Sequence, residues 1–262
     1  MLGKLIKYEF KATARLLIPL YCALIGFAII NKLFIGNGFE IENVEFLNGI
    51  PFMITMAAYG ITMVATMVVT LIIIIQRFYK NLLCDEGYLM NTLPISVWKN
   101  ITSKLAVAFI WNVISGAVAL LSIFILAYHS GIMNDINSGI KEIYTLAYNE
   151  FGSGINLIII EFIIATLVQA VSGIIIIYTS ISLGHLANKR KILCSFGAFI
   201  VLNMISSAIS GMFTSSFVFE MNDISISSIQ TEVLIMTIIT IVLTAGFFAT
   251  SNYILKNKLN LE

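Results

Sequence analysis

The chain has 262 residues, of which 59% are hydrophobic and only 11% are charged. An ordinary globular domain carries about 25% charged residues, and a single core of this length cannot bury so much apolar surface. The composition therefore excludes a soluble globular protein, and the formal net charge of +1 conceals an uneven distribution of charges along the chain.

Six apolar runs are long enough to cross a bilayer, which takes about 20 helical residues. They comprise residues 16–35, 50–75, 105–128, 155–181, 192–213 and 233–253. The fourth run exceeds a straight crossing, so we expect it to tilt, to bend near Gly173 or to project beyond the bilayer. The predicted fold class is an all-α polytopic membrane protein with six transmembrane helices.

The basic residues predict the orientation of these spans. Six crossings return the C-terminus to the side of the N-terminus. If that side is the cytosol, only Lys32 and Lys141 of the 15 Lys and Arg residues lie outside. Because Lys and Arg near span ends stay in the cytosol, we expect both termini to be cytosolic. The outer loops are acidic, which is explained more simply by solubility than by attraction of cations.

The N-terminal residues 1–15 have a basic amphipathic pattern. On a helix, the basic side chains share one stripe and apolar side chains lie broadly opposite, although Glu9 interrupts the apolar face. The basic stripe consists of Lys4, Lys7, Lys11 and Arg15. This pattern predicts a helix in the inner headgroup layer, or charges that only fix the topology. Pro19 predicts a bend before the first span.

The outer connections are predicted to contain no folded domain. They are residues 36–49, 129–154 and 214–232. Gly, Asn and Ser are frequent in the first two, which indicates turns. The third retains apolar residues, including Phe217 and Phe219, so we expect it to approach the lipid surface.

Motifs for catalysis and for cofactors are absent from the sequence. There is no phosphate-binding loop and no zinc motif, so the chain is expected to hold no nucleotide and no metal. His129 and His185, the two histidines, are predicted on opposite sides of the membrane and cannot share a site. We therefore predict no catalytic residue and no enzyme activity in this chain.

The segment between the second and third spans has an unusual pattern for a connector. Residues 77–83 can extend the second span as a helix, which Gly87 would interrupt. A short apolar helix follows and ends at Pro94, after which Ser96 is a plausible cap for the next helix. A connector with this internal structure is typical of a docking surface.

This segment resembles the motif E-G-x-L-x-x-x-L-P-[IV]-S, followed by Lys, of ABC-2 family permeases. The matching residues are Glu86, Gly87, Leu89, Leu93, Pro94, Ile95 and Ser96, with Lys99 or Lys104. Residues 5–11 and the six-span plan also resemble small Gram-positive members of that family. Tyr88 departs from the family pattern, which often has Thr or Ser after the Gly.

The resemblance implies that residues 1–262 form a single transmembrane permease domain of a bacterial cytoplasmic-membrane exporter. Its coupling helix, docked on cytosolic ABC ATPase subunits, would comprise Asp85, Glu86, Gly87, Tyr88, Leu89, Leu93 and Pro94. Residues 1–15 would be an elbow helix against membrane lipid, and the segment after Thr214 would be partly re-entrant. ATP and Mg would bind the ATPase, and a second identical or related permease would complete the transporter. No nucleic acid is expected.

The implied substrates are amphipathic peptides, such as toxins or antimicrobial peptides, or hydrophobic drugs. Within the spans we predict a polar path formed by Asn112, Glu161, Gln169 and Asn203, because charged groups in a bilayer face protein or water. The alternative is that Glu161 is protonated or hydrogen-bonded and only holds helices together. A secondary carrier or a membrane sensor or scaffold is the alternative function, although a carrier should show several intramembrane ionisable groups.

Overall fold

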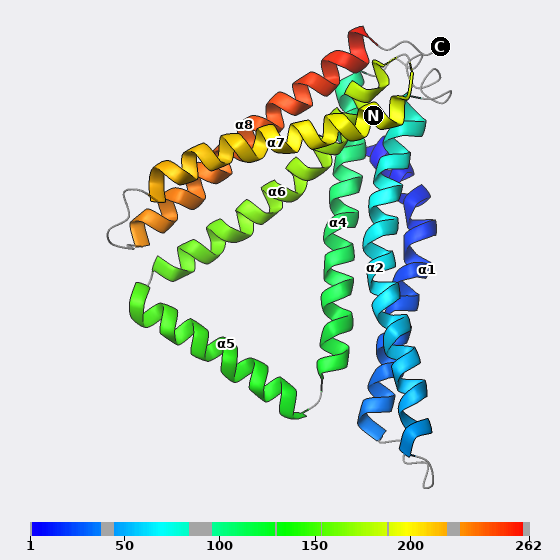
Figure 1. Ribbon diagram of the computed structural model, residues 1–262, viewed down its shortest axis with the longest axis vertical. Helices are drawn as coiled ribbons and strands as arrows, with labels where there is room; N and C mark the ends of the chain where they lie inside the picture. The colour runs from blue at the N-terminus through cyan, green and yellow to red at the C-terminus, as the bar shows by residue number, and fades with distance from the viewer. Residues whose placement is uncertain are drawn as a thin grey trace. The chain divides into compact units, whose positions relative to one another are not determined.

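The computed structural model describes residues 2–37, 45–83, 96–128, 130–152, 154–187, 189–218 and 226–258, which form seven helices (Figure 1) and no strand. The helices are α1 (Leu2–Asn37), α2 (Glu45–Leu83), α4 (Val97–Ala127), α5 (Ser130–Phe151), α6 (Gly154–His185), α7 (Lys191–Val218) and α8 (Ile226–Asn257). Within the described ranges six of them, all except α5, are long and apolar enough to cross a membrane. The prediction of an all-α, multi-pass membrane protein with six candidate spans is confirmed.

The helices extend beyond the apolar runs because backbone hydrogen bonding continues past the hydrocarbon core. The predicted extension of the second span is confirmed, since α2 runs to Leu83. Residues 2–15 are the first turns of α1, and Pro19 lies inside this helix. A separate elbow helix is therefore not confirmed.

The prediction of turns between the third and fourth spans is wrong. Residues 130–151 form the 22-residue helix α5. The Gly, Asn and Ser residues that suggested turns lie between apolar residues at helical spacing, which include Ile136, Ile140 and Ile143. A regular apolar face can keep a segment helical despite its weak intrinsic helix propensity.

The chain divides into two compact units. Unit 1 contains Met1–Leu5, Ile74–Phe109 and Thr145–Glu262, and unit 2 contains Ile6–Ile73 and Ile110–Tyr144. Unit 1 therefore holds α6, α7 and α8 with the ends of α2 and α4 that flank residues 84–95. Unit 2 holds most of α1 with the remaining parts of α2 and α4.

Buried polar side chains join the helices of unit 2. The hydroxyl oxygen of Tyr21 on α1 lies 2.5 Å from Oγ of Ser115 on α4, which lies 3.0 Å from Oγ1 of Thr70 on α2. Nε1 of Trp111 donates a 2.6 Å hydrogen bond to Oγ1 of Thr13. Polar groups in an apolar environment are costly unless paired, so these bonds hold the three helices in one register.

The register of unit 2 agrees with alternating crossings. Along α1 and α4 the numbers of the paired residues rise together: Thr13 pairs with Trp111, and Lys32 pairs with Tyr128. In the second pair, Nζ of Lys32 lies 4.7 Å from the ring centroid of Tyr128. These two helices are therefore parallel. The pairing of Tyr59 with Ser122, beside that of Thr70 with Ser115, makes α2 antiparallel to α4. This is the arrangement expected when successive spans cross the membrane in alternating directions, because the first and third spans then run the same way.

Ser115→Ala is expected to lower the free energy of unfolding by about 1 kcal/mol, between the averages found for single hydrogen bonds in membrane proteins and in model transmembrane peptides. The substitution removes the oxygen that joins α1 and α2 to α4 and leaves the buried Tyr21 hydroxyl without this partner. Unfolding in bicelles would measure the change. Thr102→Val on the same helix is the matched control, because among the described residues the Thr102 hydroxyl bonds only its own helix, at the Trp98 carbonyl. Equal effects of the two substitutions would contradict the prediction.

In unit 1, α6 packs against both α7 and α8 (Figure 1). The Thr179 hydroxyl donates to the Phe247 carbonyl at 2.9 Å, and Oγ of Ser182 lies 3.2 Å from Oγ of Ser251. These pairings make α6 and α8 parallel, as fourth and sixth crossings should be. All the buried residues of α6 lie in its second half, from Ser172 to Gly184. The first half of α6 contains no buried residue.

Candidate functional site

The predicted coupling residues lie outside the described part of the chain. They are Asp85, Glu86, Gly87, Tyr88, Leu89, Leu93 and Pro94. The helices on both sides of this segment are described. The chain leaves α2 at Leu83 and enters α4 at Val97, directly after Ser96, whose carbonyl accepts a 2.9 Å bond from the Lys99 amide. This position of Ser96 agrees with the predicted start of the helix.

The two helix ends that flank residues 84–95 are anchored in the core of unit 1. Phe78 is fully buried and stacks on Tyr178 of α6, with ring centroids 4.0 Å apart. The same cluster includes Leu82 and Leu83 of α2, Ile101 of α4 and Leu255 of α8. Because close-packed cores transmit displacement, a movement of these helix ends would reach α6 and α8.

The basic residues at the start of α1 are exposed, as a lipid-facing or topology-fixing stripe requires. They are Lys4, Lys7, Lys11 and Arg15. At the start of α4, Nζ of Lys99 lies 5.5 Å from the ring centroid of the exposed Trp98. Lys104 is only 4% exposed, so the two lysines that match the family motif have different environments.

A groove with polar side chains lies between α6 and α8, at the middle of both helices. Its volume is about 510 Å³. Its lining consists of Ala165, Thr166, Gln169, Ala170, Met236, Thr237 and Thr240. Gln169 lies halfway along α6 and is exposed. An amide in the middle of a span faces protein, water or substrate rather than lipid, because its polar atoms are costly in hydrocarbon.

The threonines of this groove can accept hydrogen bonds from a ligand. Each hydroxyl donates to a carbonyl of its own helix: Thr166 to Phe162 at 2.8 Å, Thr237 to Val233 at 2.7 Å, and Thr240 to Met236 at 2.8 Å. With the proton used in this way, the oxygen keeps a lone pair for a donor in the groove. The groove therefore combines acceptors with the donor and acceptor atoms of the Gln169 amide.

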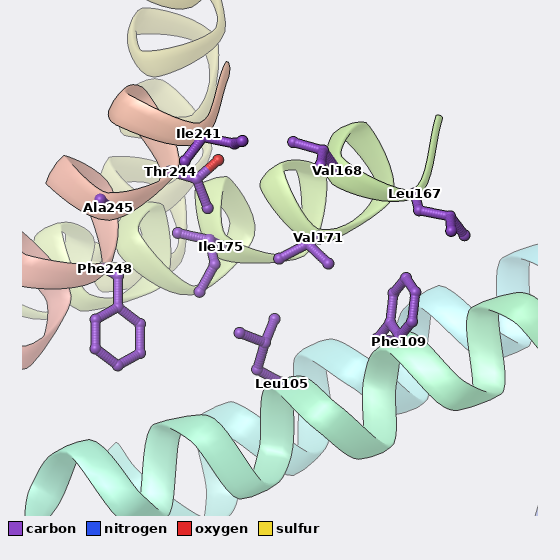
Figure 2. A pocket seen from close by; sticks show the side chains of 10 residues that line it. All are labelled: Leu105, Phe109, Leu167, Val168, Val171, Ile175, Ile241, Thr244, Ala245 and Phe248. Atoms are coloured by element: carbon purple, nitrogen blue, oxygen red, sulfur yellow. The ribbon is translucent and has the colours of Figure 1, made fainter. Parts of the chain in front are cut away.

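A second hollow, almost entirely apolar, lies on another side of α6 (Figure 2). It has a volume of about 500 Å³. Figure 2 shows Leu105 and Phe109 of α4 facing Val171 and Ile175 of α6, with α8 closing the hollow. Thr244 of α8 lines it too, but its hydroxyl donates to the Thr240 carbonyl at 2.6 Å. This pocket suits an apolar ligand.

The structure gathers only part of the predicted substrate path. Gln169 lines the polar groove, whereas the Asn203 side chain donates to the Phe199 carbonyl of its own helix at 2.8 Å. Glu161 is half-buried, and its Oε2 has no hydrogen-bond partner among the described residues. Asn112 is exposed and belongs to unit 2.

Sequence reasoning missed the threonines of the groove, although their spacing carried a signal. Thr237 and Thr240 lie three residues apart, which places them on one face of α8. The sequence alone does not reveal that this face meets Thr166 and Gln169. That juxtaposition depends on the parallel packing of α6 and α8.

Searches of known proteins identify no relative: no family model, no curated protein and no solved structure matches this chain.

Proposed function

We propose that this protein is the membrane-spanning subunit of an ATP-driven exporter of the bacterial cytoplasmic membrane, with both termini in the cytosol. A separate cytosolic ATPase would bind ATP and Mg and would dock on residues 85–94. Two permease chains would form the transporter and would alternate between inward-open and outward-open packings.

The anchoring of the two helix ends beside residues 84–95 is the observation that carries the proposal. A force applied by an ATPase to this segment would act on Leu83 and Ile101, which pack in one core with Tyr178 of α6 and Leu255 of α8. The same two helices, α6 and α8, line the polar groove at mid-span. A mechanical connection from a docking segment to a candidate substrate path is what an ATP-coupled permease requires.

The two hollows support a substrate with both polar and apolar groups. The acceptors around Gln169 suit the backbone N–H groups of a peptide, and the pocket in Figure 2 suits apolar side chains or a hydrophobic drug. An amphipathic peptide is therefore the favoured substrate class. Binding sites of alternating-access transporters typically lie near the middle of the membrane, where this groove lies.

Co-purification with a co-expressed cytosolic ABC ATPase tests the proposal. The wild-type chain is expected to retain the ATPase, and Glu86→Lys is expected to weaken binding by about tenfold or more, equivalent to about 1.4 kcal/mol. The substitution reverses the charge of a side chain that is predicted to contact the ATPase. Glu40→Lys is the matched control, since it makes the same charge change in a predicted outer loop. Absence of binding by the wild type, or unchanged binding and ATP-dependent transport in Glu86→Lys, would contradict the proposal.

Glu161→Gln is expected to reduce ATP-dependent transport in vesicles by several-fold. The substitution keeps the side chain's size and removes its capacity for charge at a position where Oε2 has no hydrogen-bond partner among the described residues. Size-exclusion chromatography would establish that assembly is normal. Unchanged transport with normal assembly would remove Glu161 from the path and leave it a role in holding helices together.

A further inference from the structure

Helix α5 has two chemically different faces. One face carries a continuous apolar stripe at helical spacing. This stripe consists of Ile136, Ile140, Ile143, Tyr144 and Ala147. The opposite face is polar and consists of Asp135, Ser138, Glu142, Thr145 and Asn149.

The isoleucines of the apolar stripe of α5 are exposed in the structure. Ile140 is 62% exposed and Ile143 is 69% exposed. Contiguous exposed apolar surface marks a site of contact with another protein or with a membrane. The position of α5 in the chain decides between these partners.

Both ends of α5 are attached closely to candidate spans. Only residues 128–129 separate it from α4, and only residues 152–153 separate it from α6. Gly152 has a φ of 60°, and its amide donates a 2.7 Å bond to the Tyr148 carbonyl, so α5 ends sharply before the chain enters α6. Because each span ends at a bilayer boundary, both ends of α5 lie at such a boundary.

A transmembrane orientation of α5 conflicts with its composition. At 1.5 Å per residue the helix is about 33 Å long, which is enough to cross. However, it carries Asp135, Lys141, Glu142 and Glu150 and is not one of the six helices apolar enough to span. A seventh crossing would also move residues 189–191, a basic run, to the outside, against the distribution of Lys and Arg. Because both ends of α5 lie at a bilayer boundary and the helix does not cross, its axis lies along the membrane surface.

We propose that α5 is a lipid-binding helix in the headgroup layer of the membrane face opposite the termini. Its apolar stripe inserts among the upper acyl chains, and its polar face contacts water. The helix carries one basic residue, Lys141, against three acidic residues, Asp135, Glu142 and Glu150. Burial of apolar surface therefore drives the contact, and attraction to anionic lipid does not. The proposal is independent of ATP-driven transport.

Depth-dependent quenching in the full-length protein tests this orientation. Cys22, Cys84 and Cys194 are first replaced by Ser, and one environment-sensitive fluorophore is attached at Ile140→Cys or, as the matched control, at Ser138→Cys. Ser138 is exposed on the polar face, and cysteine is close to it in size. Both variants are reconstituted in phosphatidylcholine vesicles after size-exclusion chromatography has shown equal assembly.

The Ile140→Cys label is expected to be quenched several times more strongly by nitroxide lipids than the Ser138→Cys label, and less by aqueous iodide. Equal iodide quenching at the two positions would overturn the proposal, because α5 would then lie in water. Shielding of the Ile140→Cys label from both quenchers would also overturn it and would assign the stripe to a second protein chain. Lipid quenching that required added phosphatidylglycerol would overturn the inference that apolar burial drives the contact.

Discussion

Gly184→Ala is expected to abolish the normal folding of the α6–α7 pair. A Cβ atom at position 184 would overlap the backbone nitrogen and Cα of Ser195, as well as its side chain. Backbone atoms cannot move aside as a flexible side chain does, so the two helices would have to separate. Overpacking of this kind typically costs about 1–3 kcal/mol, and more where the surroundings cannot yield.

The connection between α6 and α7 gives little room for such a separation. The amide of Ala187 donates to the Gly184 carbonyl at 3.2 Å, which continues the end of α6 as a tight turn. Arg190 has a φ of 56°, in the left-handed region that residues with a side chain disfavour. Its carbonyl accepts a 3.1 Å bond from the amide of Cys194 at the start of α7. The close approach at Gly184 is therefore held by a short and already constrained turn.

Gly173→Ala on the same helix is the matched control for Gly184→Ala. A Cβ at position 173 has no described atom within 4 Å, and alanine favours a helix by about 1 kcal/mol over glycine. Fluorescence-detected size-exclusion chromatography and thermal unfolding in detergent would measure both variants. We expect Gly173→Ala to resemble the wild type and Gly184→Ala to lose its monodisperse peak. Equal thermal midpoints for the two variants would refute the close contact.

The spans were predictable from sequence because lipid imposes a simple rule on composition. Apolar runs such as residues 105–128 and 155–181 lie almost wholly within α4 and α6. The helix ends were less predictable, since hydrogen bonding continues into polar residues such as Arg77 and Lys80 of α2. Helix α5 was not predicted because its Gly, Asn and Ser residues favour turns. The apolar residues at helical spacing, which indicate a helix, were not considered.

The candidate site was predictable only in part, because a sequence shows which side chains are polar but not which ones meet. Gln169 was predicted as part of a polar substrate path, and the structure places it in a groove with threonines from α8. Asn203 was predicted in the same path, but its side chain bonds the carbonyl of Phe199 one turn earlier on its own helix. Whether a side-chain amide bonds a carbonyl of its own helix depends on its rotamer, which the spacing of residues in the sequence does not reveal.

If the protein is the proposed transporter, filling the polar groove is expected to block transport almost completely. In Ala165→Phe, an apolar ring would occupy part of the space of about 510 Å³ beside Gln169 and would replace water or substrate at mid-span. Ala165 is half-buried at the edge of the groove, so the ring can enter the hollow without displacing the backbone. ATP-dependent peptide uptake into inverted vesicles would measure the loss.

Ala245→Phe is the matched control, because the same substitution fills the apolar pocket on the other side of α6. If an amphipathic peptide moves along the polar groove, Ala245→Phe should impair export of a hydrophobic drug more than export of the peptide, and Ala165→Phe should do the reverse. The ratio of peptide transport to drug transport, measured within each variant, distinguishes the roles of the two hollows. A loss of stability would lower both rates of a variant together and leave this ratio unchanged. Normal peptide transport by well-assembled Ala165→Phe would exclude the groove as the path.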